Sequence, residues 1–203
     1  LLVKLADLAP DDEETERCLN SSEKVLVGWA KLSAGNCDDK VAVLKWALDE
    51  YSNVGWRLME KVLRSQQIFP TPYEPVYRDW KVEKQQASEE ERGDYVRKAL
   101  TEAVSLAQCF ADRWLSLLGV LDYVSADDRS MLVEELWNAL SRSSWNADEV
   151  LKVYLFTVAF VSRHQAHRQA SWALSAEDLQ PFVDVMSAIE PCDDPRKFAW
   201  LFN

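Results

Sequence analysis

Apolar side chains recur at intervals of three and four residues through most of the chain, which is the spacing of amphipathic helices. One stripe contains Val41, Leu44 and Leu48, and a second contains Leu58 and Val62. Strict alternation of apolar and polar residues, the pattern of a half-buried strand, is nearly absent. The pattern therefore predicts an all-α fold with about eight to ten helices.

Residues with a strong capping preference precede several stripes. Ser88 followed by Glu91 forms a capping-box sequence, and Ser175 followed by Asp178 begins a later helix. Asn146 precedes a long helix, in which residues 153–161 are rich in β-branched and aromatic side chains. A buried strand is the alternative for that run, but the helix-type flanks favour a helix.

The first 22 residues divide into three expected parts. Four leucines among the first eight residues indicate a short helix that ends before Pro10. Residues 11–16 are mostly acidic and predict a loop. Ser21 or Ser22 is then the expected N-cap of the next helix.

Residues 69–80 interrupt the helical pattern, because Pro70, Pro72 and Pro75 force an extended or turning backbone. We interpret residues 69–87 as a crossover between an N-terminal helical group, residues 1–68, and a C-terminal helical stack, residues 88–203. Short helices joined by short loops favour an irregular α-solenoid-like stack of helical hairpins in one continuous domain. Both ends of the chain look cut from a longer protein.

The crossover carries the candidate interaction residues Tyr73, Tyr77, Arg78 and Trp80. We expect this segment chiefly to lie across the helices and staple them, and recognition of a partner is the alternative. Tryptophans on the predicted inner stripes are expected to be core residues: Trp29, Trp56, Trp114 and Trp137.

The net charge and the spacing of the cysteines limit the kinds of partner and the cell compartment that we expect for this chain. The net charge of −11 argues against nucleic acid and anionic membranes as partners. Arg57, Lys61 and Arg64 share one helix face, which we interpret as a solvated face. The cysteines are widely spaced, and this spacing favours reduced and mostly buried thiols in a cytoplasmic protein. They are Cys18, Cys37, Cys109 and Cys192.

His164 and His167 are the two histidines of the chain and would lie on one helix face. Arg163 and Arg168 beside them would repel a metal ion, so we interpret the group as cations that offset a helix dipole. Glycine-rich phosphate loops and the common hydrolase motifs are absent from the sequence. We therefore expect no catalytic site, metal or cofactor within these residues.

Five segments resemble the helical region of very large bacterial proteins that carry sirtuin-like or STAND-type nucleotide-binding modules and are linked to antiphage defence. The segments are Leu1 to Pro10, Asn20-Ser21, Gly55 to Leu58, Pro72 to Trp80 and Phe198 to Phe202. The resemblance implies a sensor or scaffold region, with nucleotide chemistry outside this chain. It carries over no catalytic residue.

The first functional hypothesis is a non-catalytic scaffold or protein-interaction segment, whose partner is a protein or another domain of the same polypeptide. A second is a small ligand-binding or enzymatic domain with a pocket beneath the crossover, where Tyr77, Arg78, His164 and His167 supply polar groups. A third is a stand-alone acidic immunity or adaptor protein that binds a basic partner.

Overall fold

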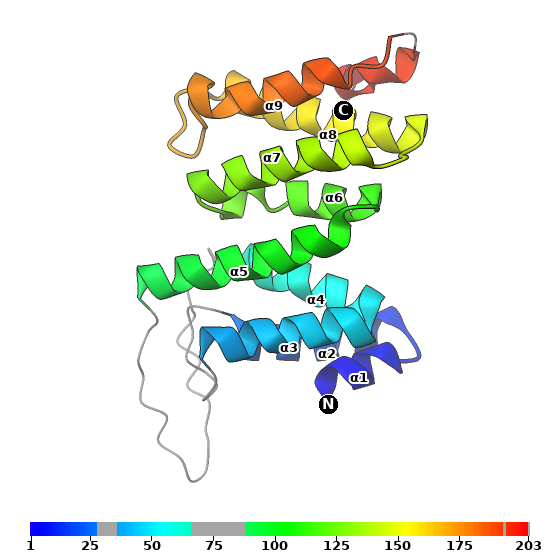
Figure 1. Cartoon of the computed structure of the whole chain (residues 1–203), viewed down its shortest axis with the longest axis vertical. Helices are drawn as coiled ribbons and strands as arrows, with labels where there is room; N and C mark the ends of the chain where they lie inside the picture. The colour runs from blue at the N-terminus through cyan, green and yellow to red at the C-terminus, as the bar shows by residue number, and fades with distance from the viewer. Residues whose placement is uncertain (28–35, 66–87, 193, 203) are drawn as a thin grey trace. The chain divides into compact units, whose positions relative to one another are not determined.

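The computed structural model describes residues 1–27, 36–65, 88–192 and 194–202. These ranges contain nine α-helices and no strand, which confirms the all-α prediction (Figure 1). The elements are α1 (Leu2–Asp7), α2 (Asp12–Leu26), α3 (Cys37–Glu50), α4 (Ser52–Arg64), α5 (Glu89–Ala107), α6 (Ala111–Leu118), α7 (Ala126–Arg142), α8 (Ala147–Ala166), α9 (Ala176–Ala188) and the 3₁₀ helices η2 (Leu121–Tyr123) and η3 (Pro195–Phe202).

The chain divides into two compact units. Unit 1 comprises Leu1–Ala103 and Asp122–Ser125, and unit 2 comprises Val104–Leu121 and Ala126–Asn203. The domain boundaries expected at residues 68 and 87 adjoin or fall within the segment that the structure does not describe, so they stay predictions. The same holds for the stacking of the hairpins into a solenoid.

In unit 1, consecutive helices pack as pairs, α1 with α2 and α3 with α4, and α2 also contacts α4. Gly55 of α4 permits a close approach to α3, because a Cβ at that position would lie 2.3 Å from the carbonyl oxygen of Ala47. The Tyr95 hydroxyl of α5 donates to the carbonyl oxygen of Leu26 at 2.5 Å. Burial raises the pKa of this phenol, so it stays a hydrogen-bond donor.

In unit 2, α8 contacts α6, α9 and η3. Leu151, Tyr154 and Val158 of α8 form a buried cluster, against which Met186 of α9 packs. Residues 153–161 lie within α8, so the alternative of a buried strand is wrong. In the part of the chain that is described, no helix is both long and apolar enough to cross a bilayer.

Three predicted helix starts have the capping geometry that their sequences indicate. Glu91 N–H donates to the Ser88 hydroxyl at 3.1 Å, and Ser88 N–H donates to the Glu91 carboxylate at 2.8 Å. The Asn146 side chain accepts from two backbone N–H groups at the start of α8. The Ser175 hydroxyl accepts from the Asp178 N–H. These contacts satisfy N–H groups that have no partner within the helix.

The expected acidic loop at residues 11–16 is wrong. Asp11 is the N-cap of α2 and accepts from the Glu14 N–H at 2.8 Å, and the acidic residues that follow fill the first helical turn. Negative charge is favourable there because it faces the positive end of the helix dipole. Ser21 and Ser22, expected as caps, lie inside α2 and donate to carbonyls four residues earlier.

Two predictions of burial also need correction. Trp114 is fully buried as expected, whereas Trp137 is 44% exposed, and Trp29 lies outside the described residues. The four cysteines are free thiols, but none is fully buried: Cys18 and Cys37 are partly buried, and Cys109 and Cys192 are exposed. Residue type alone predicts burial for both tryptophan and cysteine, whereas the helix face that each occupies decides it.

Candidate functional site

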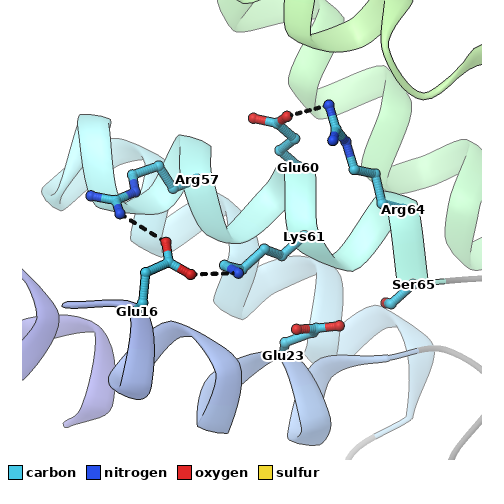
Figure 2. A pocket seen from close by; sticks show the side chains of 7 residues that line it. All are labelled: Glu16, Glu23, Arg57, Glu60, Lys61, Arg64 and Ser65. Atoms are coloured by element: carbon cyan, nitrogen blue, oxygen red, sulfur yellow. Dashed lines mark hydrogen bonds and ion pairs between the residues drawn. The ribbon is translucent and has the colours of Figure 1, made fainter. Parts of the chain in front are cut away.

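A pocket of about 360 Å³ opens between α2 and α4 in unit 1 (Figure 2). Its lining is almost entirely charged. Three carboxylates and three cations alternate around it, together with one hydroxyl: Glu16, Glu23, Arg57, Glu60, Lys61, Arg64 and Ser65. This composition suits charged groups, because each ionised side chain can form a charge-assisted hydrogen bond with a ligand of opposite charge.

Glu16 connects the two helices. Its carboxylate accepts from Arg57 at 2.8 Å and from Lys61 at 2.7 Å, and Arg57 also reaches Asp12 at 3.2 Å. The hydrogen bond from Lys61, followed by that from Arg57, lowers the pKa of Glu16. The three cations of α4 were expected to form a solvated face. Instead, Arg57 and Lys61 bind carboxylates of α2, and Arg64 binds Glu60 at 2.7 Å.

Glu23 differs from the other two carboxylates of the pocket. It has no cation within ion-pair distance among the described residues, and Figure 2 shows its carboxylate near Ser65 and apart from the dashed ion pairs. Burial raises the pKa of Glu23, and this effect outweighs the opposing influence of Lys61 and of a hydrogen bond with Ser65. The pocket therefore contains one carboxylate whose charge is poorly compensated.

Replacing Glu23 by glutamine is expected to raise the melting temperature at pH 7 by about 1 to 2 °C, a small effect because the carboxyl is half exposed and partly screened. The folded-state pKa is raised, so the wild type loses stability as the pH rises through this pKa and the charge forms. Below about pH 3, well under the ordinary pKa of a glutamate, the carboxyl is protonated in both folded and unfolded chains, and the difference should vanish. Thermal melts at both pH values measure it.

The control for this variant is Glu14→Gln, which removes an exposed carboxylate from the first turn of the same helix. There the negative charge favours the helix, so the control should be neutral or slightly destabilising at pH 7. An equal rise in melting temperature for both variants would show that net charge, not burial of Glu23, is responsible.

The Ser65 hydroxyl lies 2.9 Å from the Val62 carbonyl oxygen and also near the Glu23 carboxylate, and its single proton can be donated to one of these acceptors at a time. Within the described ranges, no three His, Cys, Asp or Glu side chains are placed to hold a metal ion. The arrangement is suited to binding charged groups.

The four residues proposed from the sequence as an interaction surface, Tyr73, Tyr77, Arg78 and Trp80, lie outside the described residues. The pocket expected beneath the crossover is likewise untested.

The two histidines of that hypothesis are described, and they occupy different environments. His164 is buried, and its Nδ1 accepts from the Leu174 N–H at 3.0 Å. Its ring packs edge-on against Phe160 and Trp172. His167 is exposed and caps the C-terminus of α8. The Nδ1 lone pair of His164 is occupied by the backbone, so this ring links α8 to the segment that leads into α9.

A second candidate surface was missed by sequence reasoning. We call it the α1 leucine face, and it consists of Leu1, Leu5 and Leu8, which are 89%, 46% and 68% exposed. The opposite side of α1 is buried through Val3 and Ala6. The spacing of four and three residues was visible in the sequence, but such a stripe is normally assigned to a core.

The end of α1 and the beginning of α2 are strongly acidic. The carbonyl oxygen of Ala6 accepts from the Thr15 hydroxyl at 3.3 Å, which joins α1 to α2. Exposed carboxylates extend from the last residue of α1 into the first turn of α2: Asp7, Asp11, Asp12, Glu13 and Glu14. We call this run of carboxylates, which continues the sequence of the leucine-bearing helix, the acidic margin.

Comparison with protein-family models, with curated proteins and with solved structures finds no match for this chain. The resemblance to helical regions of large bacterial defence proteins consequently stays a prediction, and the functional argument rests on the geometry of the two surfaces.

Proposed function

We propose that this chain is a non-catalytic helical scaffold that binds a protein partner through the α1 leucine face. The observation that supports the proposal is the exposure of Leu1, Leu5 and Leu8 on a helix whose other side is buried. Exposing large aliphatic side chains to water is unfavourable, and a contiguous apolar stripe of this kind commonly marks an interaction site.

The partner that fits is a basic amphipathic helix. A stripe with spacings of four and three residues is the surface that a second helix packs against. The acidic margin from Asp7 to Glu14 favours lysine and arginine beside the apolar contact, since complementary charge steers association and selects the partner. The helix belongs to another protein or to another domain of the same polypeptide.

The setting in this proposal is the cytoplasm of a bacterium, within a larger protein. Its support is the resemblance described above together with the free thiol state of all four cysteines, since disulfides predominate in oxidising compartments. The high negative charge supports a basic protein partner over nucleic acid.

The test uses two synthetic amphipathic peptides of about 18 residues, one built from leucine and lysine and the other from leucine and glutamate. Fluorescence anisotropy should show binding of the basic peptide and none of the acidic one. The variant Leu5→Gln/Leu8→Gln should weaken the binding of the basic peptide by about tenfold or more, because each change removes apolar contact area. Both side chains are exposed, so the fold should tolerate the changes.

A matched control is Val43→Gln/Phe110→Gln, which removes two exposed apolar side chains elsewhere. This control should bind the basic peptide as the wild type does. Equal weakening in both variants would contradict docking on α1. Concentration-dependent self-association that the α1 variant abolishes would identify a second copy as the occupant instead.

A further inference from the structure

We propose that the pocket between α2 and α4 binds an alkylguanidinium or alkylammonium group through the carboxylate of Glu23. In the cell this group would be the end of an arginine or lysine side chain of the protein partner. This inference rests on the proposed function for the source of the cation, and it names the partner's contact chemistry. The pocket itself is a separate surface from the α1 leucine face.

Glu23 is the carboxylate of the pocket that forms no ion pair within the described part of the chain. The two negative charges of Asp12 and Glu16 balance the positive charges of Arg57 and Lys61. The charge of Glu60 balances that of Arg64. These groups neutralise one another in ion pairs of 3.2 Å or less. Glu23 remains with no cation at ion-pair distance in the described part of the chain. An entering cation would therefore meet a carboxylate on which Lys61 and Lys24 act only from beyond ion-pair distance, and whose burial outweighs their effect.

The position of Glu23 on its helix strengthens this preference. Glu23 lies in the last turn of α2, which ends at Leu26. Carbonyl groups at a helix C-terminus carry partial negative charge, which disfavours a carboxylate and favours a cation beside it. Desolvation adds to the cost of the isolated carboxylate, as the raised pKa of Glu23 indicates. A bound cation would relieve both effects.

The neighbouring cations limit the repulsion that a ligand would experience. Lys61 is held between the Glu16 carboxylate at 2.7 Å and the Asn20 side-chain oxygen at 3.0 Å. Arg64 is held by Glu60 on its own helix. The pocket volume of about 360 Å³ equals roughly a dozen molecules of liquid water, which is enough for a charged head group and part of its stem.

The experiment follows backbone amide resonances of the full chain during titration with capped amino acids. N-acetyl-arginine amide and N-acetyl-lysine amide supply the two cations, and N-acetyl-citrulline amide is a neutral near-isostere of the arginine. The two cations should shift the amides of Glu23 and Ser65 with dissociation constants in roughly the millimolar range, while the citrulline derivative should not. Absence of shifts for both cations would overturn the inference.

The matched variants are Glu23→Gln and Glu14→Gln, which remove one negative charge each from the same helix. Glu23→Gln should weaken the binding of the capped cations by about tenfold or more, whereas Glu14→Gln should leave their affinity almost unchanged. Because Glu23→Gln is expected to be at least as stable as the wild type, lost binding would not reflect unfolding. Equal weakening by both variants would overturn a specific role of Glu23.

The outcomes also separate this inference from the proposed function. Binding of the basic peptide to α1 without any effect of the capped cations at Glu23 would overturn the inference and leave the proposed function standing. If the capped cations bind at Glu23 and the basic peptide does not bind to α1, the proposed function is overturned and the binding of a cation at Glu23 stands. Putrescine, a free diamine, serves as a third probe. If putrescine binds and neither capped amino acid does, the cation does not come from a partner side chain, and that part of the inference is overturned.

Discussion

Replacing Gly55 by alanine is expected to lower the free energy of unfolding of unit 1 by about 2 to 3 kcal/mol. A Cβ at this position would lie 2.3 Å from the carbonyl oxygen and 2.5 Å from the carbonyl carbon of Ala47. Both atoms belong to the backbone of α3, so a side-chain rotation cannot relieve the overlap. The helices α3 and α4 would have to separate, which loosens the packing of Leu44 and Leu58.

Gly93 provides the matched control. It lies in α5, and a Cβ there meets nothing within 4 Å. Gly93→Ala should therefore stabilise the chain by about 0.5 to 1 kcal/mol, because alanine loses less backbone entropy when a helix forms. Chemical denaturation followed by far-ultraviolet circular dichroism measures both variants. Stabilisation by Gly55→Ala would show that the close approach of α3 and α4 is absent in solution.

Replacing Trp114 by alanine is expected to destabilise unit 2 by about 3 to 5 kcal/mol. Trp114 lies in α6 and is completely buried, so its removal leaves a large cavity. Trp114→Phe should cost clearly less. The indole N–H makes no hydrogen bond in the described structure, so phenylalanine forfeits packing but no polar partner.

Trp137 serves as the comparison because it is the same residue type on an exposed helix face. Trp137→Ala should lower the free energy of unfolding clearly less than Trp114→Ala, by about 1 to 2 kcal/mol, because a large part of the Trp137 side chain is already in water. Denaturant unfolding monitored by circular dichroism gives the differences for all three variants. Similar losses for the alanine variants at 114 and 137 would contradict the burial assigned to each side chain.

The helical architecture is largely visible in the sequence because its signals are local. The caps at Ser88, Asn146 and Ser175 act within three residues of themselves, and the apolar stripes repeat within a turn. The start of α2 was missed because its first turn contains no apolar stripe. An acidic run has the same composition in a solvated loop and in a helix that it caps.

The candidate site is much less predictable. The cations at 57, 61 and 64 are apparent as one helix face. The partner of Arg64 is Glu60 on the same helix, but the carboxylate partners of Arg57 and Lys61 lie on α2, and Glu16 is 41 residues from Arg57 in the sequence. Only the tertiary packing of α2 on α4 brings them together. The raised pKa of Glu23 likewise depends on burial, which no spacing rule reveals.

The preference of neighbouring helices for one another also bears on the order in which the chain acquires structure. In unit 1, α1 contacts α2 and α3 contacts α4, and in unit 2 α8 contacts α9. Contacts between segments close in sequence require little loop closure, and chains rich in them fold rapidly. The α1–α2 pair has all its residues within the first 26. Its contacts therefore require the closure of only a short loop.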